Sequence, residues 1–348
     1  MKTIAVVGAS PFAAFLAGLL AADHSRAVVL LSPPADPYRL RPLPALSLAP
    51  LTRPETWSLL ATHTRKTVRR LARIAPGTSE RIDMRLSARS PDATIALSHI
   101  HRTADGFRVP IDPPVAAGGA TILGLRDVWL FEPAPLAAAA PAWLAGANVA
   151  MLNALDGLRL RRDGTASFGA TAIDQVVLAD DAAILDWLDA GEIAHFARVE
   201  HWLGVETLPH RLARYRAGVD LDTGAVFAQS GDGIIRAAAR DDDGGGFEVI
   251  AASLAHDPAP RLAARTRFAR LVTHDGAPAF GPTRRAKIFV IAGLGVLDLV
   301  LAPRLAAIIA GTADGIESEW AAAHGADLRQ PRRAVAEFAP GHIPGGVA

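Results

Sequence analysis

Buried strands of the parallel type near both ends of the chain, with antiparallel segments between them, predict an α/β protein. The expected architecture is a Rossmann-like dinucleotide-binding domain, discontinuous in sequence, with an inserted, mainly antiparallel β substrate domain. Three stretches carry this prediction, namely residues 3–31, 173–179 and 287–292. The chain has 348 residues, which is enough for two domains with sizeable cores.

The first 31 residues have the pattern of a strand, a tight turn, a helix and a second strand. Thr3 to Val7 is a short apolar run that ends at Gly8, as expected of a buried parallel strand. Ser10 can cap the following helix, and Pro11 occupies its first position, where a missing N–H costs nothing. A helix N-terminus at the end of a parallel strand favours anions, because its free N–H groups and its dipole point toward the ligand.

The same residues allow a second interpretation. Residues 1–22 also resemble a secretory signal peptide, with Lys2 followed by an apolar stretch. Gly8 and Pro11 interrupt that stretch, and a second strand over 27–31 follows at the spacing of a βαβ unit, which favours the first interpretation. No other segment has the roughly 18 to 20 uninterrupted apolar residues of a membrane span. A cytoplasmic protein is the simpler expectation, and an exported one is the alternative.

Composition excludes several classes of function. The chain has 36 Lys and Arg against 35 Asp and Glu, so its charge gives no support for nucleic-acid binding. It has no cysteine, which excludes disulfides, thiolate metal sites, a cysteine nucleophile and cysteinyl attachment of a cofactor. His99 and His101 are expected on one face of a strand without a third ligand, so no metal site is predicted.

The middle of the chain is expected to alternate between loops, helices and strands. A proline-rich loop over 33–54 precedes a helix from Glu55 to Ile74, and the basic side of that helix, within residues 65–73, is either a docking face for a protein partner or a solvated surface. The further predictions are strands broken by turns over 81–131 (one turn at Asp105-Gly106), a helix over 133–144, a strand over 148–152, a hairpin over 158–168 around Asp163-Gly164, antiparallel strands over 195–252 with a hairpin loop from Asp241 to Gly246, a helix from Ala302, and a loosely ordered tail over 327–348.

Three places together resemble the D-amino-acid oxidase and glycine oxidase group of FAD-dependent oxidoreductases. They are the N-terminal unit, the block from Trp129 through the hairpin to the strand ending at Ala179, and the segment from Arg270 to Pro282. The last is similar to the family pattern R-P-x-T-x-D-G-x-P-x-x-G, and Gly293, Gly295 and Leu301-Ala302-Pro303 follow at the family's distance. The resemblance spans nearly the whole chain in order.

This resemblance implies non-covalent FAD and oxidation of an amine or amino-acid C–N bond by hydride transfer to flavin. It assigns residues 1–80, 119–190 and 265–326 to the FAD domain, and 81–118 and 191–264 to the substrate domain. Arg270 matches the arginine that binds the substrate carboxylate, although an ion pair with Asp275 or a surface position is an equal alternative. The implied cofactor-binding residues are Gly8, Ser10, Pro11, Ala13, Ser32, Ala179, Gly293, Gly295 and Asp298.

The departures from the family pattern fall at positions expected to contact FAD. Ser10 and Ala13 replace two glycines of G-x-G-x-x-G, and Ser32 replaces the acidic residue that holds the ribose. Asp180 and Asp181 place two negative charges near a phosphate-rich ligand. The remaining departures are Leu294, Leu297 and Asp298 in the last motif.

These departures leave a second class of function open. The chain is either a divergent FAD-dependent oxidoreductase or a cofactor-defective member of the family that acts as a non-catalytic partner subunit or binds another nucleotide such as ADP. A nicotinamide-dependent dehydrogenase is a minor third option, since Ser32 would tolerate a 2′-phosphate but no basic residue follows it closely.

Overall fold

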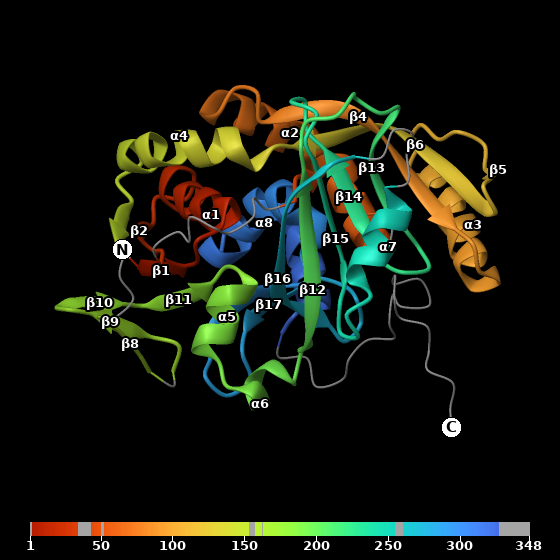
Figure 1. Ribbon diagram of the computed structural model, residues 1–348. Coiled ribbons are helices and arrows are strands. Elements are labelled where there is room, and N and C mark those ends of the chain that lie inside the picture. The colour runs from red at the N-terminus through yellow and green to blue at the C-terminus, as the bar shows by residue number, and fades with distance from the viewer. Residues whose placement is uncertain are drawn as a thin grey trace.

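A six-stranded sheet forms the centre of the N-terminal unit. The computed structural model describes residues 2–33, 43–49, 52–152, 157–161, 163–254 and 260–326. The strand order of this sheet is β17-β18-β11-β1-β2-β7, in which only the edge strand β17 is antiparallel to its neighbour (Figure 1). The strands are β1 (Thr3–Val7), β2 (Ala27–Leu31), β7 (Ala150–Leu152), β11 (Gln175–Leu178), β17 (Ala279–Pro282) and β18 (Phe289–Ala292).

The central strands of this sheet are buried on both faces. In β1, Ile4 and Val6 belong to one apolar core and Ala5 and Val7 to another, which explains the continuous apolar run in the sequence. The first core is covered by α1 (Pro11–Ala22), α2 (Pro54–Ile74), α4 (Pro133–Gly146), α8 (Asp298–Ala310) and α9 (Gly315–Ala323). The second lies beneath β8 (Leu158–Leu160), β9 (Ala166–Phe168), β10 (Thr171–Ile173), α5 (Asp181–Trp187) and the short α6 (Ala190–Ile193).

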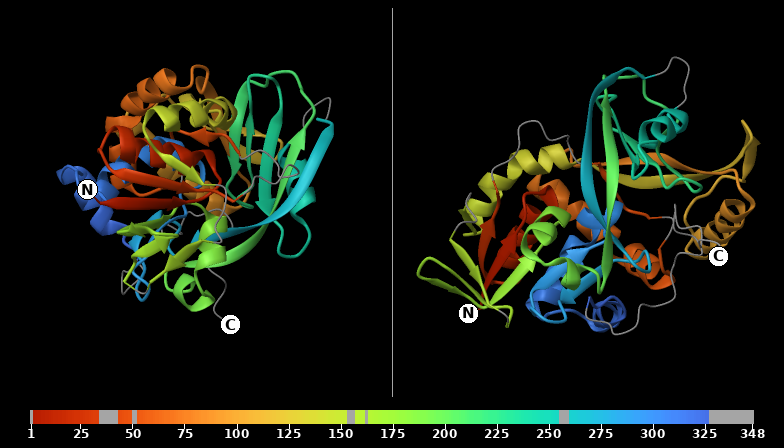
Figure 2. Two further views of the ribbon diagram at one scale, coloured as in Figure 1. Left: turned by 90° about the vertical axis from the view of Figure 1, so that its left-hand side faces the viewer. Right: turned by 60° about the horizontal axis from the view of Figure 1, so that its bottom comes forward.

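A nine-stranded, mainly antiparallel sheet stands beside the first, and its long strands β12 and β16 are prominent in Figure 2. Only the pair β13 and β4 is parallel. The order is β16-β12-β15-β14-β13-β4-β6-β3, with β5 paired to β6. The strands are β3 (Ala45–Leu46), β4 (Ser79–Ala88), β5 (Val115–Ala117), β6 (Ala120–Phe131), β12 (Ala197–Thr207), β13 (Tyr215–Asp220), β14 (Val226–Gln229), β15 (Ile235–Arg240) and β16 (Leu262–Thr273).

This two-sheet α/β architecture confirms the predicted fold class. The predicted domain boundaries stay a prediction, and strand pairing adds detail to them: β6 and β16, which contain residues 120–131 and 262–273, pair within the nine-stranded sheet. The unit β1, α1 and β2 has the predicted bounds, and the hairpin β8 and β9 is formed as expected.

The prediction of strands throughout 81–131 was wrong in part, because Pro91–Gly106 is a helix, α3. Ser90 caps it, with its Oγ accepting a hydrogen bond from the backbone N–H of Ala93 at 3.2 Å. Asp105-Gly106 is therefore the end of a helix rather than a turn between strands, and His99 and His101 lie on a helix. Ser90 followed by Pro91 is a helix-start signal that the β-branched residues inside the segment obscured.

Three further expectations need correction. The segment from Asp241 to Gly246 leads from β15 into a helix, α7 (Gly246–Ser253), and is not a hairpin loop. The last core helix, α8, begins at Asp298 rather than Ala302. Ile173 lies in β10, and the buried strand β11 begins at Gln175. The tail 327–348 and residues 34–42 and 50–51 of the proline-rich loop lie outside the described residues.

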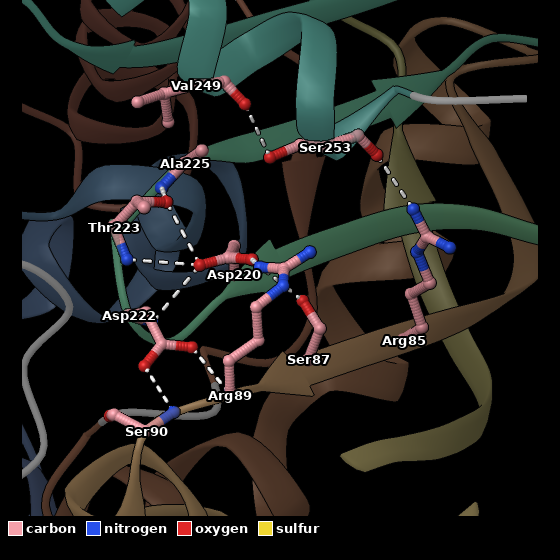
Figure 3. A network of polar contacts seen from close by, with 10 residues as sticks. All are labelled: Arg85, Ser87, Arg89, Ser90, Asp220, Asp222, Thr223, Ala225, Val249 and Ser253. Carbon is pink, nitrogen blue, oxygen red and sulfur yellow. Dashed lines mark hydrogen bonds and ion pairs between the residues drawn. The ribbon is translucent and has the colours of Figure 1, made fainter. Parts of the chain in front are cut away.

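A buried carboxylate ties α3 to the nine-stranded sheet (Figure 3). Asp220, at the end of β13, accepts hydrogen bonds from the backbone N–H groups of Asp222 and Thr223 and from the Arg89 guanidinium at 2.6 Å. Asp222 in turn accepts from the backbone N–H of Ser90 at 2.9 Å. The turn after β13 thereby holds the residue that caps α3.

Within the described residues, no single helix is long and apolar enough to cross a membrane; α8 with its short preceding turn, together with α9, reaches the required length only as a pair bent by 94°.

Candidate dinucleotide and substrate site

Three loops that matter for ligand binding follow three adjacent parallel strands. Gly8 follows β1, Ala179 follows β11 and Gly293 follows β18, and these strands are neighbours in the order β18-β11-β1. Because parallel strands end at the same edge of a sheet, the three loops lie together at the carboxyl edge, where open α/β sheets bind their ligands. The resemblance had assigned all three loops to the cofactor.

The loop between β1 and α1 has the local structure that the sequence predicts. The Ser10 side chain accepts a hydrogen bond from the backbone N–H of Ala13 at 3.2 Å, and Pro11 is the first residue of α1. The N–H of Gly8 donates to the carbonyl oxygen of Leu31 at 3.0 Å, which fixes the loop to β2. Ala179 donates to the carbonyl oxygen of Val7 at 2.9 Å and holds the end of β11 beside the loop.

The backbone N–H groups of this loop are already bound by a side chain of the chain itself. One carboxylate oxygen of Asp180, Oδ2, accepts hydrogen bonds from the N–H of Ala9 at 2.9 Å and from that of Ser10 at 3.1 Å. Its other oxygen accepts from the N–H of Ala183 at 2.9 Å and caps α5. One aspartate therefore occupies donors that a phosphate group uses in this type of loop.

The space above Gly8 is filled as well. A Cβ atom placed on Gly8 would lie 2.7 Å from Asp180 Oδ2 and 2.9 Å from the Cβ of Ala13. The backbone of the loop thus has the shape of a pyrophosphate cradle, while the Asp180 carboxylate stands inside it. As arranged, the loop does not accept a pyrophosphate, and a dinucleotide fits only when this side chain leaves.

The end of β2 provides no carboxylate for a ribose. Ser32 donates its backbone N–H to the carbonyl oxygen of Leu152 at 3.0 Å, and its hydroxyl donates to the carbonyl oxygen of Pro33 at 3.2 Å. A hydroxyl in this place forms a neutral hydrogen bond at most, which is weaker than one to a carboxylate.

The loop after β18 requires glycine at two positions. Gly293 has φ 69° and Gly295 has φ 54°, in the left-handed region that favours glycine. A Cβ on Gly293 would lie 2.7 Å from Cγ2 of Thr273, and one on Gly295 would lie 3.1 Å from a terminal nitrogen of Arg270. The loop is therefore packed closely against β16.

Asp298 begins α8 immediately after this loop. Its carboxylate accepts a hydrogen bond from the backbone N–H of Leu299 at 2.6 Å, and burial raises the pKa of the Asp298 carboxyl group to about 7. The residue keeps a small exposed surface although protein surrounds the carboxyl group. This carboxyl group therefore changes charge near neutral pH, at the start of a helix that the family resemblance places at the flavin.

Arg270 is held on β16 without a carboxylate partner among the described residues. Its guanidinium lies over the ring of Trp202, 4.6 Å from the ring centre, and against Gly295. The alternative of an ion pair with Asp275 is wrong, because Asp275 pairs with Arg53 at 2.6 Å.

Glu200, which lies opposite Arg270 on the neighbouring strand β12, is already neutralised. One of its oxygens accepts from Arg198 at 2.8 Å and the other from the indole N–H of Trp202 at 3.2 Å. The guanidinium of Arg270 is thus available to an anionic group at the Gly295 loop.

The sequence did not reveal what Asp180 and Asp181 contact. Asp181 accepts a hydrogen bond from the backbone N–H of Leu271 at 3.0 Å, which anchors the strand that carries Arg270 to the start of α5. The two aspartates were visible as negative charges where the family has a small residue and glycine. Their partners are 90 or more residues away in sequence, so no local signal could identify them.

A separate cluster brings metal-ligand atoms together. His63, Asp314 and Glu317 have ligand atoms within 4.8 Å of one another. The guanidinium of Arg304 already pairs with Glu317 and lies 3.4 Å from Nδ1 of His63. A cation therefore occupies this cluster from within the chain, and it acts as a structural contact between α2, α8 and α9.

Comparison of the whole structure with solved structures finds oxidases that share this fold. Iminodiacetate oxidase from Chelativorans sp. BNC1 matches with a TM-score of 0.66 and 17% sequence identity, over 89% of this chain and 95% of the other. Glycine oxidase from Bacillus cereus ATCC 14579 matches with a TM-score of 0.67 and 12% identity, over 90% and 96%. An L-α-glycerophosphate oxidase from Mycoplasma pneumoniae with FAD bound matches with a TM-score of 0.63 and 11% identity, over 91% and 95%.

These likenesses confirm the fold that the resemblance implied, and at such low identity they extend to the fold alone. No protein-family model matches the chain, and no curated protein matches its sequence.

Proposed function

We propose that this chain is an FAD-dependent oxidoreductase that acts on the C–N bond of a small amine or amino acid, with hydride transfer to flavin. The fold it shares with amine and amino-acid oxidases supports the reaction class. The observation that carries the proposal is the Arg270 guanidinium, which is held against the Gly295 loop with no carboxylate partner among the described residues.

The chain's own residues would bind and orient the substrate. Arg270 would bind a substrate carboxylate through two parallel hydrogen bonds, and the ring of Trp202 fixes the plane of the guanidinium. Glu200 does not compete, because Arg198 neutralises it. Flavin, when bound, would supply the hydride acceptor, which no amino-acid side chain can replace.

The first test is whether the protein binds flavin. Purified native protein is incubated with saturating FAD, and its visible absorption spectrum and thermal midpoint are measured. The proposal expects the bands of a bound oxidised flavin and a rise in the thermal midpoint. A protein that stays colourless and is not stabilised by FAD would contradict it.

The second test concerns Arg270. For substrates that carry a carboxylate, R270A is expected to weaken binding by about 10- to 100-fold, the range of one or two charge-assisted hydrogen bonds, while R270K recovers part of the loss. The matched control is R265A, an exposed arginine at odd spacing on the same strand and therefore on the other face of the sheet. Equal effects of R270A and R265A, or equal loss for an amine without a carboxylate, would refute the role of Arg270.

The position of Asp180 favours a second candidate, a cofactor-defective protein that acts as a partner subunit or binds another nucleotide such as ADP. In that case the basic side of α2 is the proposed docking face for a protein partner. Arg70 already pairs with Asp23, and Lys66 and Arg69 lie on the same side. Tightly bound, stoichiometric FAD in the purified protein would remove the basis of this candidate.

A further inference from the structure

We propose that the Asp180 carboxylate is an internal competitor for the pyrophosphate of a dinucleotide, so that FAD is a dissociable ligand of this chain rather than a permanently held cofactor. The inference rests on the proposed function in one respect, namely that the ligand of the β1–α1 loop is a dinucleotide. It concerns how that ligand is admitted, which the fold does not determine.

The first argument is the set of donors. Asp180 Oδ2 accepts hydrogen bonds from two consecutive backbone N–H groups, those of Ala9 and Ser10, at 2.9 and 3.1 Å. These groups lie at the turn before α1, where phosphate oxygens bind in dinucleotide-binding folds. An incoming phosphate would have to break both bonds and would meet a like charge.

The second argument is the space. The carboxylate lies close enough to Gly8 that a Cβ there would be 2.7 Å from Oδ2, so the side chain covers the surface that the glycine leaves free. Ala13, in place of the third glycine of the fingerprint, closes the same space from the other side at 2.9 Å. Backbone and ligand cannot come into contact here while Asp180 stays in place.

The third argument is that the side chain can leave. Asp180 is half-buried and Ala9 is exposed, so the carboxylate can turn toward solvent without becoming an isolated buried charge. The start of α5 would keep Asp181 in its first turn, where a negative charge favours the helix dipole. The blocked and open states therefore differ mainly by the two bonds to the loop.

The consequence is a lowered apparent affinity. When the binding-competent state is only a fraction of the population, the apparent dissociation constant rises by the inverse of that fraction. Two charge-assisted hydrogen bonds make the open state a minor one, and we expect a penalty of about tenfold or more. Removing the carboxylate should recover this factor for every ligand that carries the pyrophosphate.

The experiment measures affinities by calorimetric titration of the full-length protein with FAD, ADP and adenosine. ADP carries the pyrophosphate without flavin, and adenosine carries neither. The variants are D180G, which empties the cradle, and D180N, which removes the charge but keeps a good N-cap for α5. The control is D174N, which changes the same charge at the opposite edge of the sheet, where Asp174 accepts from the N–H of Thr3 at 2.7 Å.

The expected result is weak FAD and ADP binding by the natural protein, at least about tenfold tighter binding by D180G and D180N, and no change for D174N or for adenosine. Folding of each variant is checked by its thermal midpoint. A natural protein that retains stoichiometric FAD through desalting, or folded Asp180 variants that bind FAD no more tightly, would overturn the inference and leave the proposed function intact. Folded proteins that bind neither FAD nor ADP at millimolar concentration, with or without Asp180, would overturn both.

Discussion

The ionisation of Asp298 should make the ligand-free protein less stable as the pH rises. Burial raises the pKa of this carboxyl group from 3.8 to about 7 in the folded state. The folded protein therefore binds a proton more tightly than the unfolded chain does. Stability is greatest below pH 3.8, falls as the pH rises from 3.8 to about 7, and is constant above that value as far as this group is concerned.

The magnitude follows from the size of the shift. One pKa unit corresponds to about 1.4 kcal/mol, so the whole shift is at most about 4 kcal/mol. About two units of it lie between pH 5 and pH 7, which limits the change measurable there to about 3 kcal/mol. We expect about half of that limit, because the side chain keeps some exposure to solvent, which screens the effect.

The substitution that tests this reasoning is D298N. Asparagine keeps the volume and an oxygen that accepts the N–H of Leu299, but it cannot ionise. Urea unfolding followed by tryptophan fluorescence at pH 5, 6.5 and 8 should show that D298N gains about 1.5 kcal/mol over the natural protein as the pH rises. The control is D92N, an exposed aspartate in the first turn of α3. A difference between D298N and the natural protein that is the same at all three pH values would refute the argument.

Three further predictions concern stability, each measured by urea unfolding. G18A should destabilise the protein by about 1–3 kcal/mol despite the better helix propensity of alanine, because the new Cβ would lie 2.3 Å from Trp143, and the double variant G18A/W143L should recover most of the loss. D220A should cost about 3 kcal/mol, since it leaves the buried donors of the turn after β13 unpaired, whereas R89A, which removes a half-exposed partner, should cost less than about 1 kcal/mol; equal losses would contradict this division. S10A should cost about 1 kcal/mol through loss of the α1 cap, and an unchanged midpoint would refute the role of the Ser10 hydroxyl.

Local sequence signals predicted the elements that position the site. The apolar run before Gly8, the cap at Ser10 and Pro11 at the first helical position together determine β1 and α1, and the structure has the predicted bounds. The same kind of signal was present at Ser90-Pro91, but the β-branched interior of α3 led to the wrong assignment. Helix α3 forms because its apolar residues pack on the nine-stranded sheet, and such packing overrides local propensity.

The sequence by itself determined the fold class, the order of the loops at the carboxyl edge of the parallel sheet, and the list of positions that depart from the dinucleotide fingerprint. These follow from hydrophobic periodicity, helix caps and motif spacing, all of which act over a few residues. Only the tertiary structure decided what those departures do. Asp180 reaches the N–H groups of Ala9 and Ser10 across about 170 residues of sequence, and Arg270 lies against Gly295 rather than on Asp275. Such contacts depend on which strands become neighbours, and strand order is set by the packing of the whole sheet rather than by any local pattern.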